Sequence, residues 1–404
     1  MNKLLEIALG VVTSIGGFLD AGTMAASAQA GARFGYSLLW ALLLGMACII
    51  FLVEMSGRLA AVSRHTLRDA VHKRFGLNFS LSLLAVSMIL NLLVLACEIG
   101  GVSMALQLIS GISLQWWVLP VAAAMWAVLW FGSFGVIEKG ISIAGLITIA
   151  FIVGAWKLHP PGPDMLRGLL PSLPAQDKTN YWFTAVSILG ANVSPYLMFF
   201  YSSGAVEEKW DQSHVTVNRF VAAIGMIFGA SIAAGIVVVA ARVLGPAGIR
   251  VDDYHQAALM LTPLWGWWGF LVFVLCLAIA SFGAGVEVIL AIAYELAQSF
   301  GWTWGKNKRA RDEARFTLGY TAPILLASLI MVTGIEPLRL TMFTMALTCA
   351  ALPLATFPFL VLLNDPIYMR EHTNPRWMNY IVAGIVTLAC ILAVVALPLQ
   401  IFGA

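Results

Sequence analysis

Two short stretches of this chain place polar and helix-breaking residues inside long apolar runs. The first is Asp20-Ala21-Gly22-Thr23, with Gly17 shortly before it. The second is Gly190-Ala191-Asn192-Val193-Ser194-Pro195. If both runs cross a membrane, the Asp20 carboxylate lies near its middle, where a charge is costly unless it is paired, hydrated or bound to a cation. Asp20 is therefore the first candidate for binding a cation.

Two further acids are candidates for proton exchange or for supporting the cation site. Glu98 lies in Cys97-Glu98-Ile99-Gly100-Gly101, and Glu287 ends Gly285-Val286-Glu287. For the two glutamates the alternative is a protonated carboxyl group that is hydrogen-bonded between helices. Both interpretations remain open from the residues alone.

The composition of the chain is that of an integral membrane protein. Of its 404 residues 60% are hydrophobic and only 11% are charged, against about 25% charged residues in a soluble domain. At about 20 residues for each spanning helix, the chain accommodates about ten to twelve spans. These proportions exclude soluble enzymes and nucleic-acid-binding modules, and the net charge of +3 is too small to indicate a polyanionic partner.

Hydropathy predicts an all-helical fold in which residues 1–404 form a single transmembrane domain. The first five expected spans form one repeat, about residues 7–157, the next five form a second, about residues 182–363, and an extra helix covers about residues 377–402. The eleven expected spans are residues 7–31, 36–62, 77–108, 115–133, 139–157, 182–202, 218–244, 264–299, 316–334, 340–363 and 377–402.

Basic residues predict how these spans are oriented. The loop after the second span holds Arg58, Arg64, Arg68, Lys73 and Arg74, and the loop after the eighth holds Lys306, Lys308, Arg309, Arg311 and Arg315. Cytoplasmic loops are enriched in such residues, so the N-terminus is expected in the cytoplasm and the C-terminus outside the cell membrane. Five spans in each repeat invert the second repeat relative to the first. Transporters built from inverted repeats bind their substrate at broken helices near the bilayer midplane, where the two polar stretches fall.

The motifs and their order resemble the Nramp family of divalent-metal transporters. The stretch from Asp20 to Trp40 is similar to the family's D-P-G-N followed by A-T-x-x-x-A/G-G-A-x-[YF]-G-Y-x-L-L-W, and Gly190 to Tyr196 is similar to G-A-x-V-M-P-H. Glu98 stands where the family has A-E-x-I-G, and Ser56-Gly57-Arg58-Leu59 is similar to S-A-R-L. The resemblance covers about residues 8–363. It implies the LeuT fold, with two inverted five-helix repeats and a cation site between broken helices 1 and 6.

Departures from the family pattern bear on the choice of ion. Ala21 and Thr23 replace the proline and asparagine of D-P-G-N, Ser194 replaces the methionine of the sixth helix, and no Gln lies between Leu347 and Pro353. The ligand set that the resemblance then implies is the Asp20 carboxylate, the hydroxyls of Thr23 and Ser194, and the backbone carbonyls of Gly17 and Ala191. Hard cations prefer such oxygens and a thioether favours softer transition metals, so this set favours a hard ion such as Mg²⁺ or Mn²⁺. Mg²⁺ usually keeps several waters, which suits a site with one carboxylate. The resemblance therefore favours a magnesium-transporter-like branch.

Proton coupling in the family is thought to use a chain of titratable groups that this sequence lacks in part. The sixth-helix histidine is Tyr196, whose phenol has an ordinary pKa of about 10, and Leu95 replaces an acid one turn before Glu98. The interior of residues 316–333 holds no Lys or Arg. We therefore expect transport by alternating access with little or no proton movement.

Two other functions remain open from the sequence, because a fold does not fix a substrate. Asp20 could be the counter-ion of an amino acid or amine, with the helix start after the second stretch ready for a carboxylate. A channel or sensor is the third hypothesis. In each case we expect no enzymatic activity, no cofactor beyond the transported Mg²⁺ or Mn²⁺, no nucleic-acid partner, and a monomer in the lipid bilayer.

Overall fold

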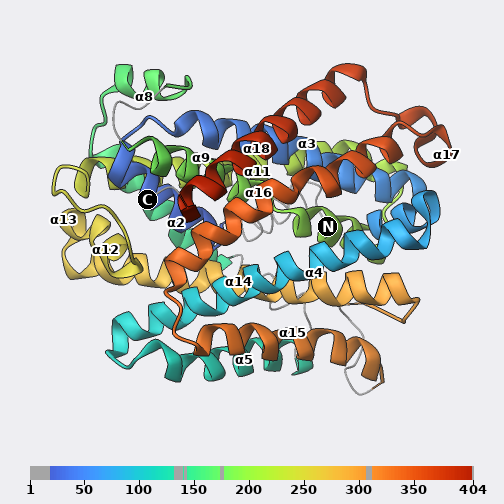
Figure 1. Ribbon diagram of the computed structural model, residues 1–404, viewed down its shortest axis with the longest axis horizontal. Coiled ribbons are helices and arrows are strands. Elements are labelled where there is room, and N and C mark those ends of the chain that lie inside the picture. The colour runs from blue at the N-terminus through green and yellow to red at the C-terminus, as the bar shows by residue number, and fades with distance from the viewer. Residues whose placement is uncertain (1–18, 132–139, 141–142, 173–176, 306–311, 403–404) are drawn as a thin grey trace.

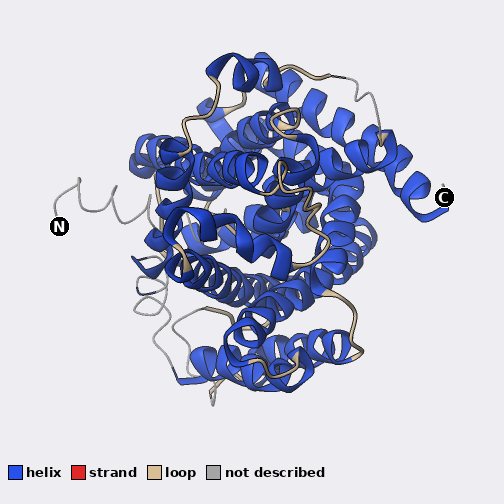
Figure 2. Ribbon diagram, turned by 90° about the vertical axis from the view of Figure 1, so that its left-hand side faces the viewer, coloured by secondary structure: helices blue, strands red, loops and turns tan. Residues whose placement is uncertain are grey.

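The computed structural model describes residues 19–131, 140, 143–172, 177–305 and 312–402 of the chain. Within these residues the secondary structure is helical throughout, and no strand occurs. Figure 2 views the helices nearly end on and shows them packed around one another in a single bundle. The prediction of an all-helical membrane domain is confirmed.

Nine helical segments in the described part of the chain are long and apolar enough to cross a membrane. They are α3 (Leu39–Ser63), α4 (Leu67–Ser110), α5 (Leu114–Phe131), the broken pair α9 (Lys178–Asn192) and α10 (Pro195–Glu207), α11 (Val215–Val243) with the short turn before it, α14 (Trp267–Phe300), α15 (Ala314–Val332), α16 (Pro337–Leu363) and α18 (Arg376–Phe402).

Shorter helices complete the chain. They are α2 (Ala21–Phe34), α7 (Ile149–Lys157), α8 (Gly162–Gly168), α12 (Tyr254–Ala258), α13 (Thr262–Trp265) and α17 (Pro366–Met369), with the 3₁₀ turns Leu146–Thr148, Gln212–His214, Leu259–Leu261 and Arg370–His372.

These segments match the expected spans, with one clear correction. The third span was expected from residue 77, but α4 begins at Leu67. Its first turns are polar and escape a hydropathy window, although Thr66 caps them by accepting a hydrogen bond from the Asp69 N–H at 3.1 Å. Gly76, with φ 80°, bends the helix between its polar and apolar parts. The first expected span is described only from residue 19, and the fifth appears as a shorter apolar helix over Ile143–Lys157.

The centre of the molecule is built from α4, α14 and the broken helix α9–α10. In Figure 1, α4 and α14 run side by side through the middle, with α5 and α15 beyond them. The apolar window of α9–α10 is 94% buried, whereas those of α5 and α18 are 28% and 33% buried. The helix that carries the second polar stretch is thus enclosed by its neighbours, and α5 and α18 face outward.

Candidate cation site

The first polar stretch is the start of α2. Asp20 is the N-cap of this helix, with an extended backbone, and its Oδ1 accepts a hydrogen bond from the Thr23 N–H at 2.6 Å. An aspartate here satisfies one of the donors that a helix N-terminus leaves unpaired. Asp20 is only 3% exposed and Thr23 is 1% exposed. Gly17, the carbonyl donor expected before Asp20, lies outside the described residues.

The second polar stretch interrupts a membrane-spanning helix, as the sequence predicts. Helix α9 ends at Asn192, Val193 and Ser194 adopt non-helical backbone conformations, and α10 begins at Pro195. Proline fits this first position because its missing N–H would have no partner inside the helix. The Ser194 hydroxyl donates to the carbonyl of Ala191 at 3.5 Å, and both residues are buried.

The two stretches lie next to each other in the bundle. Helix α2 packs against α9, and the Tyr196 phenol lies within electrostatic range of the carboxyl groups of Asp20, Glu287 and Glu98. All four side chains are buried. The start of α2 is therefore in contact with Glu98 of α4, and Tyr196 of α10 lies within electrostatic range of Asp20, Glu98 and Glu287.

Glu98 and one residue outside the predicted set form hydrogen bonds with the backbone of Ala21, the residue after Asp20. The Glu98 Oε2 accepts a hydrogen bond from the Ala21 N–H at 3.2 Å. The Tyr254 hydroxyl, from the short helix α12, donates to the Ala21 carbonyl at 3.1 Å. Sequence reasoning missed Tyr254 because it lies in a connection between two spans, where nothing marks it as part of a site.

Helix α16 contributes a thioether beside the first stretch. The Met345 side chain packs on Gly22, and a Cβ at Gly190 would overlap the Met345 carbonyl oxygen. Glycine at position 190 lets the backbones of α9 and α16 approach closely, and glycine at position 22 leaves room for the Met345 side chain on α2. Ser194 replaces the thioether of the family pattern. The sulfur of Met345 was not among the ligands predicted from the sequence.

The candidate donors next to Asp20 are oxygens from different chemical groups, with the Met345 thioether beside Gly22. In the part of the chain that the structure describes, no three His, Cys, Asp or Glu side chains gather into a metal-binding cluster. A cation at Asp20 would accordingly be held by one carboxylate, hydroxyls and backbone carbonyls, and would keep part of its water shell.

Glu295 on α14 is a further buried acid, and it was not among the residues predicted from the sequence. Its Oε1 accepts hydrogen bonds from the Ser87 hydroxyl at 2.8 Å and from the Asn91 amide at 3.0 Å, and Arg68 lies within electrostatic range. A signal did exist in the sequence. Asn91 and Ser87 precede Glu98 by 7 and 11 residues, which places all three on one face of α4.

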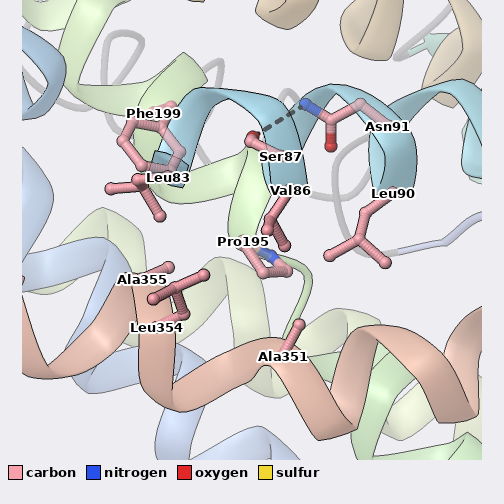
Figure 3. Close-up of a pocket in the computed structure, with 10 residues that line it drawn as sticks. All are labelled: Leu83, Val86, Ser87, Leu90, Asn91, Pro195, Phe199, Ala351, Leu354 and Ala355. Carbon is pink, nitrogen blue, oxygen red and sulfur yellow. Dashed lines mark hydrogen bonds between the residues drawn. The ribbon is translucent and has the colours of Figure 1, made fainter. Parts of the chain in front are cut away.

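A small cavity lies beside the polar group formed by Glu295, Ser87 and Asn91. Figure 3 shows Ser87 and Asn91 of α4 joined by a hydrogen bond, with Pro195 and Phe199 of α10 close to them and Ala351 of α16 on the other side. Its volume is about 10 Å³, roughly the room that one water needs. The start of α10 is thus connected to the Glu295 group by only a narrow space in this conformation.

Comparisons with known proteins give consistent results. The family model for natural resistance-associated macrophage protein-like proteins (Nramp) matches residues 10–399. The divalent metal cation transporter MntH of Erwinia tasmaniensis is 24% identical over 394 residues, which cover 94% of this chain and 91% of the relative. MntH of Bradyrhizobium diazoefficiens is 26% identical, covering 93% and 86%.

Two solved structures share the fold. The manganese transporter of Eremococcus coleocola, in complex with an aromatic bis-isothiourea substituted compound, superposes with a TM-score of 0.82 at 17% identity, covering 98% of this chain and 87% of that one. MhsT in complex with L-phenylalanine gives a TM-score of 0.62 at 14% identity, covering 96% and 97%. The chain therefore has the LeuT fold.

Proposed function

The chain belongs to the Nramp family, and on this premise we propose that it carries a hard divalent cation, Mg²⁺ or Mn²⁺, across the membrane by alternating access. Members of this family are transporters, so the chain is not an enzyme. The MntH relatives are named as divalent metal cation transporters, which supports the same class of substrate here.

The observation that carries this proposal is the buried Asp20 carboxylate at the start of α2. The Tyr196 phenol, two residues after Ser194, lies in electrostatic range of Asp20, and the last carbonyls of α9, including that of Ala191, end at the second break. A helix C-terminus carries partial negative charge. Asp20 and this helix end together favour a cation.

Oxygen ligands decide between hard and soft ions in this proposal. Ser194 offers a hydroxyl where the family pattern has a thioether, and Thr23 offers another hydroxyl next to Asp20. These ligands suit Mg²⁺ and Mn²⁺ better than softer metals. Glu98, Tyr196 and Glu287 surround the site and support it.

The proposal includes an orientation and an assembly state. With the basic loop ends in the cytoplasm, the N-terminus lies inside and the C-terminus outside, and the protein acts as a monomer. The two inverted repeats, about residues 7–157 and 182–363, would rock against each other around the fixed site.

A carrier of a small organic solute is the alternative function. The start of α10 supports it, because no side chain caps this helix and its N–H groups could receive a carboxylate. MhsT, which has a similar fold, was solved with L-phenylalanine.

Uptake into proteoliposomes distinguishes the two functions. Purified protein is reconstituted, and Mn²⁺ uptake is measured in competition with Mg²⁺ and with a panel of amino acids and amines, with protein-free liposomes as the control. We expect Mg²⁺ to compete and the organic solutes to have no effect. Uptake of an amino acid or amine without any Mn²⁺ or Mg²⁺ uptake would establish the alternative.

A further inference from the structure

Ala21, the residue that follows Asp20, is held at both of its backbone polar groups. The Glu98 carboxyl group on α4 accepts from the Ala21 N–H, and the Tyr254 hydroxyl on α12 donates to the Ala21 carbonyl, at 3.2 and 3.1 Å. All three residues are fully buried. Three elements thus meet at the one residue that links Asp20 to its helix.

The backbone N–H of Ala21 is present because this chain has alanine where the family pattern has proline. D-P-G-N has proline at the position of Ala21, and proline has no backbone N–H. At the first position of a helix the N–H has no partner within the helix. Glu98 supplies that partner here.

Tyr254 is the last contact of a longer segment that lies along α2. The Arg250 carbonyl accepts from Arg33 at 3.0 Å, Arg33 forms an ion pair with Asp252, and the Val251 carbonyl accepts from Gln29 at 3.1 Å. Gln29 and Arg33 are four residues apart and lie on the same face of α2, two and three turns after Ala21. Residues 250–254 therefore follow α2 from its end back to the site.

Glu98 reaches Ala21 because α4 approaches α2 closely at Gly101. A Cβ at Gly101 would lie 2.5 Å from the Ser281 hydroxyl oxygen and 3.3 Å from the Ala21 Cβ. Gly101 is almost one turn after Glu98, so the close approach and the hydrogen bond belong to the same contact of the two helices.

We propose that Glu98 and Tyr254 are positioning residues that orient the Asp20 carboxylate for its cation by holding the backbone N–H and the backbone carbonyl of Ala21. Glu98 acts through the N–H and Tyr254 through the carbonyl, and neither touches the ion. Tyr254 also joins the docking of residues 250–254 on α2 to cation binding at Asp20. The inference rests on the proposed cation site.

The first test removes the Tyr254 hydroxyl alone. Tyr254→Phe should weaken Mn²⁺ binding, measured by titration calorimetry in detergent, and should raise the KM of uptake by roughly two- to tenfold, the worth of one hydrogen bond. The maximal rate should stay within about twofold, because the change acts on binding of the ion.

Tyr181→Phe is the matched control. This tyrosine is equally buried, and its hydroxyl also donates to a backbone carbonyl, that of Ser37, at 3.1 Å. Equal Mn²⁺ affinity in the two variants would overturn the role of Tyr254. A wild-type protein that binds no divalent cation would instead overturn the proposed function, so the two failures are distinguishable.

The second test separates a clamp from a proton group at position 98. Glu98→Gln keeps an oxygen that accepts from the Ala21 N–H, so Mn²⁺ affinity should stay near wild type, whereas Glu98→Ala should weaken it. Ala21→Pro removes the N–H, and the extended backbone of Asp20 permits proline after it. In that background Glu98→Ala should have no further adverse effect.

Additive losses in the doubly substituted protein, or equal losses in Glu98→Gln and Glu98→Ala, would overturn the clamp at Glu98. Gel filtration and thermal unfolding of each purified variant show that the folded protein is compared.

Discussion

At the scale of single residues, Asp20 forms no ion pair with a basic side chain in the part of the chain that the structure describes. Its observed partners are the Thr23 N–H and hydroxyl. A buried carboxylate without a basic partner is costly inside a membrane. A bound cation would supply the missing charge.

Replacing Asp20 with asparagine tests this role. Asp20→Asn keeps the size of the side chain and an oxygen that can cap α2, but it removes the charge that attracts the cation. We expect Mn²⁺ and Mg²⁺ uptake to be abolished while the protein remains folded and extractable. Asp164→Asn, at an exposed carboxylate, is the control and should transport normally. Uptake by Asp20→Asn at most of the wild-type rate would contradict the assignment.

Ser194 is the residue at which we expect ion preference to change. Ser194→Met adds a soft thioether beside the second break, so selectivity should shift from Mg²⁺ toward Mn²⁺ and Cd²⁺. Competition in the uptake assay gives the selectivity ratio, and Ser194→Leu adds similar bulk without sulfur. If the methionine and leucine variants have the same ratio, the side chain at position 194 does not reach the ion.

At the scale of helices, buried polar contacts around Arg58 join α3, α11 and the segment before α18. Arg58 forms a two-pronged ion pair with Glu54 on α3, at 3.0 and 3.1 Å, and Arg219 at the start of α11 contacts the same carboxylate at 3.2 Å. Arg58 also donates to Asn374, just before α18. The motif Ser56-Gly57-Arg58-Leu59 thus joins three elements of the bundle and lies outside the cation site.

Removing the carboxylate from this cluster should destabilise the bundle. Glu54→Ala leaves the buried Arg58 without its counter-ion, which typically costs about 3–5 kcal/mol. Thermal unfolding in detergent should show a lower midpoint than in wild type. Asp164→Ala, which removes an exposed pair with Arg167, should have little effect, because such pairs contribute about 0–1 kcal/mol. Equal midpoints in the two variants would show that the cluster adds no stability.

At the scale of the whole molecule, the placement of titratable groups bears on energy coupling. Tyr196 lies among the three acids of the site in place of the family's histidine, and α15 has no basic residue between Phe316 and Val332. A separate polar group, formed by Glu295, Ser87 and Asn91, lies between α4 and α14. The site and this group are not joined by an observed chain of hydrogen bonds among the described residues.

We therefore expect cation uptake with little or no stoichiometric proton movement. A pH-sensitive dye inside proteoliposomes, at zero membrane potential, should report no acidification that follows Mn²⁺ entry. Acidification that follows uptake and is lost in Glu295→Gln would show that the polar group of α14 relays protons. Loss in Glu98→Gln instead would assign the relay to the acid beside Asp20.

Local properties of the chain were enough to predict the fold class and the second helix break. Apolar run length predicts spans, and Gly, Pro and Asn in such a run predict an interruption, because both depend on neighbouring residues alone. The same reasoning selected Asp20 and Glu98, whereas Tyr196 was selected because it stands where the Nramp pattern has a histidine. It placed the start of α4 ten residues too late, because hydropathy does not register a helix that begins outside the apolar layer.

Contacts between distant parts of the chain were decided only by the tertiary structure. Ala21 meets Glu98 and Tyr254, which are 77 and 233 residues away, and Asn91 meets Glu295 across 204 residues. Such contacts depend on how each helix is rotated and how closely its glycines let a neighbour approach. Neither quantity is encoded by the type of a residue or its spacing, so the contacts that Tyr254 and Glu295 make became visible only once the helices were packed.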